Sequence, residues 1–332
     1  MTMISDDSQY YVQGVLDCNR RVLAKTITLI ESSLPSHQEL ARTIIDLLLP
    51  YTGKAVRLGI TGVPGVGKSM FIESLGTMLV KKGHRVAVLA VDPSSKRSGG
   101  SVLADKTRME KLAVEERAFI RPSPSGGTLG GVAKKTRETM IVCEAAGFDV
   151  MIIETVGVGQ SETTVASMVD FFLVLLIAGA GDELQGLKKG ILELADAVAV
   201  NKADGDNIEK AELARKQYET ALHFLTPSSL SWRPPVLSCS ALEMTGIDLI
   251  WETVLEHRKK LTATGELDAN RKRQAVDWMW SLVKEGLKER FYKNPEVNKM
   301  LPGILKEVKN GTTASTIAAS KLLFLLDNNP CV

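Results

Sequence analysis

The chain has 332 residues, of which 44% are hydrophobic and 24% are charged, and its formal net charge is +2. This length exceeds one average domain, and the composition is that of a globular protein, which excludes disordered and fibrous classes. A net charge this small gives no reason to expect nucleic acid or an anionic membrane as a partner.

Other features of the sequence concern the compartment. The longest apolar run, residues 171–180, is too short to span a bilayer, and the acidic N-terminus with Asp6 and Asp7 lacks the apolar core of a signal peptide. The four cysteines are single and widely spaced, which fits a reducing compartment and predicts neither disulfides nor a zinc site. We therefore expect a cytoplasmic protein that does not bind membranes.

Residues 1–52 are predicted to form an N-terminal helical segment. Pro35 interrupts it and Pro50 ends it. Its apolar residues form two stripes at helical spacing: Val22, Leu23, Ile27 and Ile30, then Leu40, Ile44, Ile45, Leu47 and Leu48. Because each stripe is apolar on one side only, helices that pack on the following domain are favoured over a partner-binding arm.

Strands and helices alternate over residues 53–265. Strands are predicted at 57–60, 85–91, 148–154, 170–177, 197–200 and 235–238, with helices at 69–82, 131–146, 218–224 and 249–261. This order predicts an α/β domain with a mostly parallel sheet covered by helices on both faces. Ligands bind such sheets at the carboxyl ends of the strands, and the motifs below all follow strands.

A complete phosphate-binding loop follows the first strand. Gly62, Gly65 and Gly67 allow successive backbone N–H groups to face phosphates, Lys68 supplies a cation, and Ser69 opens the next helix with a hydroxyl that can ligate Mg²⁺. The predicted phosphate-binding residues are Gly62, Val63, Pro64, Gly65, Val66, Gly67, Lys68, Ser69 and Met70. This motif predicts a P-loop NTPase, but it leaves the nucleotide base open.

Three acidic residues are candidates for the Mg²⁺ site. Asp92 ends a strand, and Asp105 lies in the Gly- and Ser-rich loop after it, which we interpret as a metal- and phosphate-sensing switch. Glu154 ends another strand and can orient a Mg²⁺-bound water, while the Gly157 N–H is placed to sense a γ-phosphate. No glutamine directly follows Gly157, and Gln160 is out of register, so we expect slow intrinsic hydrolysis.

The motif Asn201-Lys202-Ala203-Asp204 decides the base. An aspartate carboxylate accepts hydrogen bonds from the N1–H and exocyclic amine of guanine, a donor pair that adenine lacks. This motif follows a strand, and Ser240, Ala241 and Leu242 follow the next one, so we predict that both segments bind the base. The expected ligands are therefore GTP and GDP with Mg²⁺.

Residues 179–190 form a glycine-hinged segment with acidic and then basic residues. A solvated loop is the simple interpretation. Because the glutamine position after Gly157 is vacant, we hypothesise instead that Lys188 is brought to the γ-phosphate by a partner and accelerates hydrolysis.

These motifs together resemble the MeaB/ArgK family of P-loop GTPases, the methylmalonyl-CoA mutase-associated G-protein chaperones, over residues 20–265. The resembling segments are GVPGVGKS (62–69), AVDPSS (90–95), GGS (99–101), DKTRM (105–109), FIRPSPS (119–125), LGG (129–131), ETVGVGQSE (154–162), GAGDELQG (179–186) and NKAD (201–204). The departures are Ala104, where the family usually has Gly, and Met70, where Thr is common.

The resemblance implies a protein that hydrolyses GTP slowly, gates loading of adenosylcobalamin onto methylmalonyl-CoA mutase and protects that enzyme. It further implies that segment 179–190 is a third switch in contact with the mutase. It also implies a homodimer held by a C-terminal helical extension. Residues 266–332 are consistent with such an extension, because Val276, Trp280, Val283 and Leu287 recur at helical spacing before Asn294-Pro295 interrupts the pattern.

Two alternatives remain at this stage. A metallochaperone GTPase would normally carry His-rich or Cys-x-x-Cys runs, whereas His37, His84, His223 and His257 are isolated. A P-loop kinase acting on a protein or a small molecule would need an acceptor site and a catalytic base, and the sequence shows no clear one.

Overall fold

The computed structural model of the protein describes residues 7–91, 109–122, 129–155, 161–179, 189–223, 229 and 231–327. Its centre is a seven-stranded sheet in the order β3-β2-β4-β1-β5-β6-β7, in which every pairing is parallel. The strands are β1 (Val56–Gly62), β2 (Val86–Val91), β3 (Ala118–Arg121), β4 (Val150–Thr155), β5 (Phe171–Ile177), β6 (Ala197–Asn201) and β7 (Val236–Ser238). The predicted α/β class with a parallel sheet is confirmed.

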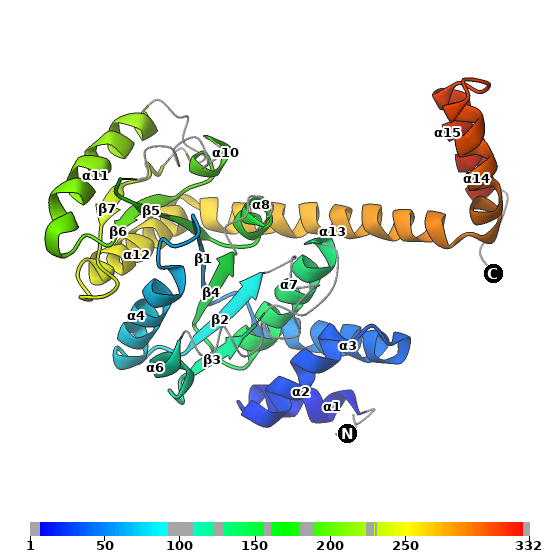
Figure 1. The fold of residues 1–332 in the computed structure, drawn as a ribbon. Helices are drawn as coiled ribbons and strands as arrows, with labels where there is room; N and C mark the ends of the chain where they lie inside the picture. Colours follow the sequence, from blue (N-terminus) through cyan, green and yellow to red (C-terminus); the bar gives the residue numbers. More distant parts are fainter. Residues whose placement is uncertain are drawn as a thin grey trace. The chain divides into compact units, whose positions relative to one another are not determined.

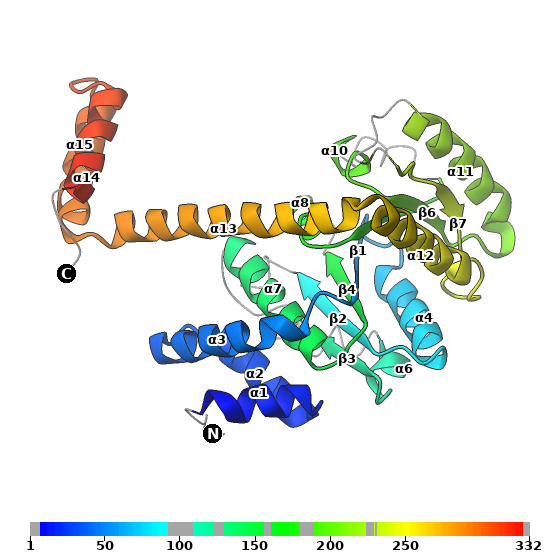
Figure 2. The same cartoon turned by 180° about the vertical axis from the view of Figure 1, so that it is seen from behind.

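Helices cover both faces of this sheet. In Figures 1 and 2, α4 lies on one face with α12, and α7 lies on the other. The helices of this part of the chain are α4 (Lys68–Lys81), α6 (Glu110–Ala113), α7 (Leu129–Ala145), α8 (Glu162–Ala166), α10 (Lys189–Leu192), η3 (Gly205–Asn207), α11 (Ile208–His223) and α12 (Ile247–Thr264). The central strands are buried on both faces, and this explains their nearly continuous apolar sequences.

Strand β3 is the one strand of the sheet that the sequence patterns did not predict. It contains only four residues, Ala118–Arg121, and it pairs with β2 alone at the edge of the sheet. So short a segment carries too little periodicity to be recognised, and its pairing with β2 depends on residues distant in the sequence.

The N-terminal helices α1 (Ser8–Leu16), α2 (Arg20–Glu31) and α3 (Pro35–Leu48), followed by η1 (Leu49–Tyr51), pack against α7. The Asn19 side chain caps α2 by accepting hydrogen bonds from the N–H groups of Arg21 and Val22 at 3.1 and 3.2 Å. The first predicted stripe is buried, with Leu23 and Ile27 at most 1% exposed. In the second, Ile44 and Leu48 are buried but Leu47 is 39% exposed, so that stripe is only partly covered. These helices belong to the same compact unit as the sheet, which extends to Arg271.

A second compact unit comprises residues 272–332. It contains most of α13 (Glu266–Lys293), together with α14 (Pro295–Lys309) and α15 (Ser315–Asp327), which pack on each other. Asn294 caps α14, with Pro295 as its first residue, so the predicted interruption is confirmed. No described residue of α13 is buried, and its predicted stripe of Val276, Trp280, Val283 and Leu287 is exposed. None of the helices in the described ranges is long and apolar enough to cross a membrane.

Candidate functional site

The phosphate-binding loop lies between β1, at the centre of the sheet, and α4. Gly65 and Gly67 have φ values of 80° and 93°, in the left-handed region where side chains are strained. Gly62 is constrained by space as well, because a Cβ at this position would lie 2.5 Å from the Leu175 carbonyl oxygen. The loop therefore requires glycine at these positions for its backbone path, as the motif predicted.

Lys68 is held inside the curve of this loop. Its ammonium donates to the backbone carbonyls of Gly62 at 2.7 Å and Val63 at 3.3 Å. Burial lowers the pKa of Lys68, while the carboxylates of Glu154 and Glu162 oppose that shift. The ammonium is thus kept within the loop that a phosphate would enter.

Ser69 and Glu154 lie side by side at the start of α4 and the end of β4. The Ser69 hydroxyl donates to Glu154 Oε1 at 3.3 Å. A hydroxyl and a carboxylate beside a phosphate loop are the oxygen donors that suit Mg²⁺, which takes few protein ligands and completes its shell with phosphates and water. The other predicted metal and catalytic residues, Asp92, Asp105, Gln160 and Lys188, lie outside the described residues.

Asn201 connects the phosphate loop with the segment after β7. This buried side chain donates from Nδ2 to the Val66 carbonyl at 2.8 Å, and its Oδ1 accepts from the Ala241 N–H at 3.1 Å. On the other side of that segment, Ser74 of α4 donates to the Ala241 carbonyl at 2.7 Å. The two segments predicted to bind the base are therefore fixed to the predicted phosphate site.

Asp204 and Ser240 are in contact where the segments that follow β6 and β7 lie side by side. The Ser240 hydroxyl donates to Asp204 Oδ2, which fixes the carboxylate and leaves Oδ1 to accept from a base. Lys202 has a φ of 60°, and a Cβ at Gly67 would lie 4.0 Å from Lys202 Cε, so this side chain runs beside the phosphate loop. The structure thus brings together residues from each of the three predicted phosphate- and base-binding segments, those that follow β1, β6 and β7. Met70 and Leu242, which were predicted with them, are exposed, and none of these hydrogen bonds involves either side chain.

Comparisons with known proteins agree with this geometry. The family model "Methylmalonyl Co-A mutase-associated GTPase MeaB" matches residues 23–296. The chain is 57% identical over 305 residues to a "Putative GTPase" of Caulobacter vibrioides, covering 92% of this chain and 93% of the relative. It is 50% identical over 293 residues to "GTPase ArgK" of Escherichia coli, with 88% of each chain covered.

The chain belongs to the MeaB family of GTPases. Among solved structures, that of LAO/AO transport system kinase is similar to this chain with a TM-score of 0.80 and 40% identity, over 99% of this chain and 100% of the other. The predicted resemblance to MeaB/ArgK GTPases and the predicted P-loop fold are therefore confirmed. The individual site residues remain predictions, because these similarities concern whole chains.

Two features of this MeaB-family site were missed by sequence reasoning. Asn207 donates from Nδ2 to the Lys202 carbonyl at 2.7 Å, directly at the residue with positive φ. Its position three residues after Asp204 was the available signal, since asparagine often bonds nearby backbone in turns. The second feature is a buried hydrogen bond between the hydroxyls of Thr155 and Thr61 at 2.7 Å. It joins residues distant in sequence, and no local pattern reveals it.

In this MeaB-family protein, three aspartates lie at the amino ends of the strands, opposite the end that carries the phosphate loop. Each directly precedes a strand and accepts a backbone N–H from the start of a neighbouring strand or from the residue before it: Asp149 from Arg85 at 2.7 Å, Asp170 from Arg57 at 3.1 Å, and Asp196 from Phe172 at 2.8 Å. They satisfy donors that the sheet ladder leaves open at these ends.

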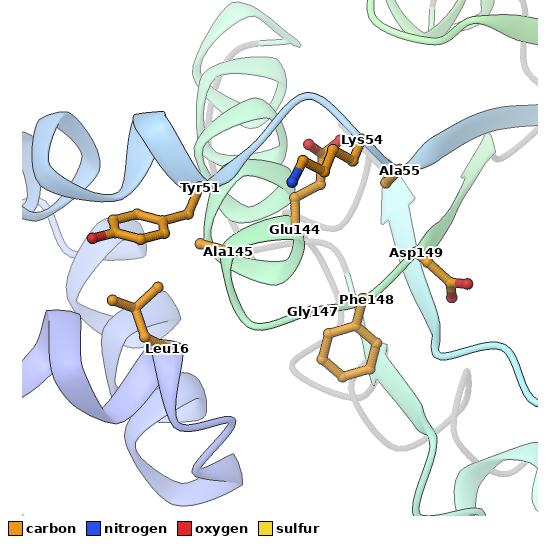
Figure 3. A pocket seen from close by; sticks show the side chains of 9 residues that line it. All are labelled: Leu16, Tyr51, Lys54, Ala55, Glu144, Ala145, Gly147, Phe148 and Asp149. Atoms are coloured by element: carbon orange, nitrogen blue, oxygen red, sulfur yellow. The ribbon is translucent and has the colours of Figure 1, made fainter.

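A cavity of about 510 Å³ lies near the amino ends of the strands (Figure 3). It is lined by Leu16, Tyr51, Lys54, Ala55, Glu144, Ala145, Gly147, Phe148 and Asp149. The Glu144 carboxylate is bound by the protein itself, since it accepts from Arg57 Nε at 2.7 Å and from the Gly53 N–H at 2.6 Å. Because the lining residues lie near the amino ends of the strands, the cavity is separate from the predicted nucleotide site at their carboxyl ends.

Proposed function

We propose that this GTPase is a nucleotide-dependent chaperone for methylmalonyl-CoA mutase, which gates adenosylcobalamin loading and protects the mutase from inactivation. The observation that carries the GTP specificity is the Asp204 carboxylate, oriented by Ser240 beside a phosphate loop that Asn201 connects to it. The mutase as partner is supported by the name of the family whose model matches the chain.

In the proposed reaction the nucleotide phosphates replace the carbonyls of Gly62 and Val63 as partners of Lys68. The residues Gly62 to Met70 then hold the phosphates, and Asn201, Lys202, Asp204 and the segment Ser240 to Leu242 hold guanine. Mg²⁺, when bound, neutralises phosphate charge and carries a water. Ser69 and Glu154 would hold that ion and orient its water, and Asp92 and Asp105 are proposed from the sequence as its further ligands.

Acceleration by the partner is the second part of the proposal. Gln160 and Lys188 are the candidates, and both are proposed from the sequence alone. Lys188→Ala is expected to leave GTP affinity and basal hydrolysis nearly unchanged, yet to remove most of the mutase-stimulated rate, roughly ten-fold or more. Single-turnover hydrolysis with and without the mutase measures this. Equal stimulation of both proteins would exclude Lys188 from the mechanism.

We also propose that the protein is a homodimer. The exposed stripe of α13, with Trp280 54% accessible, is an apolar surface of the kind that pairs with a second copy. Sedimentation equilibrium of the whole protein, compared with a Trp280→Glu variant, tests this. A wild-type monomer at micromolar concentration would contradict it. A cytoplasmic location remains a prediction from the cysteine pattern.

The experiment for the central proposal measures both nucleotide chemistry and cofactor transfer. Labelled GTP is incubated with the protein and the mutase, and adenosylcobalamin transfer is followed by absorbance with GTP, GDP or a non-hydrolysable analogue. We expect phosphate to appear in water and transfer to depend on hydrolysis. Phosphate on a protein or small-molecule acceptor would instead support a kinase, and transfer that ignores the nucleotide would exclude the gating role.

A further inference from the structure

The hydrogen bond between Thr155 and Thr61 lies where two central strands leave the sheet. The backbone pairing of β1 with β4 ends at Ile60 and Glu154. One residue further along each strand, the Thr155 hydroxyl donates to Thr61 Oγ1 at 2.7 Å, and both side chains are only 1% exposed. Among the described residues, this side-chain bond continues the connection between the strands beyond their ladder.

The residues on either side of this bond belong to the nucleotide site. Thr61 immediately precedes Gly62, the first residue of the phosphate loop, and Thr155 immediately follows Glu154. Side chains alternate between the two faces of a strand. Glu154 therefore points toward α4, where it meets Ser69, while Thr155 and Thr61 point to the face that α8 covers. The hydroxyl pair thus holds the two strands from behind the site.

We propose that Thr155 is a positioning residue, which acts through Thr61 to fix the Glu154 carboxylate beside the phosphate loop during GTP hydrolysis. The proposal rests on the proposed role of Glu154. Without the bond, the last residue of β4 keeps its pairing to Val91 of β2 but loses its connection to β1. Glu154 then varies in distance from Ser69, and a displaced group near the reacting atoms slows chemistry more than it weakens binding.

Valine substitutions can separate this role from a contribution to stability alone. Thr155→Val leaves the Thr61 hydroxyl buried without its partner, which destabilises the fold. Replacing both threonines by valine removes both polar groups, and such a matched apolar pair can be nearly neutral for stability. The double variant therefore recovers stability but still lacks the bond, and Thr155→Ser keeps the hydroxyl as a matched control.

The test measures urea unfolding, GDP affinity and single-turnover GTP hydrolysis of the full chain for Thr155→Val, Thr61→Val, the double variant and Thr155→Ser. We expect hydrolysis to fall roughly five-fold in the double variant, because the Glu154 carboxylate is then held less well beside the phosphate loop. GDP affinity should stay within about two-fold and Thr155→Ser near wild type. A double variant that regains the wild-type rate together with its stability would overturn the proposal.

Glu154→Gln distinguishes failure of this inference from failure of the function on which it rests. If Glu154→Gln hydrolyses GTP at the wild-type rate, the role of Glu154 is wrong and the positioning role falls with it. If Glu154→Gln is slow, adding Thr155→Val to it should cause no further loss, because both changes act through one carboxylate. A full additional five-fold loss would show that Thr155 does not act through Glu154, while leaving the GTPase proposal intact.

Discussion

Charged side chains lie at both ends of the parallel strands in this protein, but the two ends differ in how these side chains are hydrogen-bonded. At the carboxyl ends, the hydrogen bonds of Lys68 within the described residues go to backbone carbonyls, and Ser240 binds one oxygen of the Asp204 carboxylate, leaving the other to accept from a base. At the amino ends, Asp170 receives Arg271 through both oxygens, at 2.7 and 2.6 Å, as well as the Arg57 N–H. Lys68 and Asp204 thus keep partners that a ligand can replace or add to, whereas both oxygens of Asp170 are bound within the protein.

Whether a charged side chain already has partners within the protein distinguishes ligand-binding residues from structural residues better than its charge alone does. Carboxylates whose oxygens are already bound by guanidinium and backbone donors stabilise the fold and have little capacity for a ligand. Groups with replaceable or incomplete partners can exchange them for a phosphate or a base. We therefore expect substitutions at the carboxyl edge to change nucleotide chemistry, and those at the amino edge to change stability.

The largest expected effect is that of Lys68→Ala, which should abolish measurable hydrolysis, a loss of roughly 10³-fold, because it removes the ammonium that is held inside the loop. The melting temperature should change little. Phosphate release and a circular dichroism melt measure both quantities. Lys81→Ala, at the exposed end of the same helix, is the matched control. Retained turnover would refute the phosphate role of Lys68.

At the amino edge, Asp170→Ala should lower the free energy of unfolding by about 3–5 kcal/mol, because it leaves the Arg271 guanidinium without its carboxylate. GDP affinity of the folded protein should not change. Urea unfolding and nucleotide titration check this. Asp149→Ala is the control, since that side chain is 53% exposed and should cost much less. A loss of GDP affinity without loss of stability would break the distinction between the edges.

Asp204→Asn should weaken GTP binding by roughly 10²-fold, because it replaces one acceptor for guanine by a donor. The same change creates a better match for xanthine, so affinity for XTP should rise. Titration with both nucleotides measures the switch, and Asp206→Asn two residues away provides the control. Unchanged GTP affinity with no gain for XTP would mean that another group reads the base.

The smallest effect concerns Asp196 at the amino edge. Burial raises the pKa of Asp196 to about 7, although the Phe172 N–H opposes the shift. Burial also lowers the pKa of the neighbouring His257, whose Nε2 lies 3.6 Å from Asp196 Oδ1, to about 4.

When the pKa of an acid is higher in the folded state than in the unfolded state, the free energy of unfolding of the protein falls as pH rises from the lower pKa to the higher one. The unfolding free energy of Asp196→Asn minus that of wild type should therefore increase from about pH 4 to about pH 7, as both pKa values of Asp196 require. Urea unfolding at several pH values measures this difference. A difference independent of pH would show that Asp196 is ionised in the folded protein throughout this range.

The residues of the candidate site at the carboxyl ends of the strands could be predicted from the sequence, whereas the ion pairs at the amino ends could not, for a physical reason. Gly62 to Ser69 and Asn201 to Asp204 form their sites from consecutive residues, so backbone geometry and chemistry appear directly in the sequence. The pairs Arg57 with Glu144 and Arg271 with Asp170 join residues about a hundred positions apart. Nothing local marks such partners, because only the pairing of the strands brings them together.

The same reasoning explains the two smaller omissions. Strand β3 exists because β2 offers it an open edge, and the bond between Thr61 and Thr155 exists because β1 and β4 are neighbours. Both depend on strand order. Alternation of strands and helices predicts a parallel sheet without predicting which strands lie side by side, so neither feature is visible in the sequence.

The position of Lys68 also has a consequence for the speed of nucleotide capture. In the described structure the ammonium, the two carbonyls and the left-handed glycines already form a closed loop. At this loop an incoming triphosphate therefore meets backbone whose conformational entropy was lost on folding, and it only has to replace the two carbonyls as partners of Lys68. The phosphate loop itself should therefore not slow association by having to fold around the nucleotide.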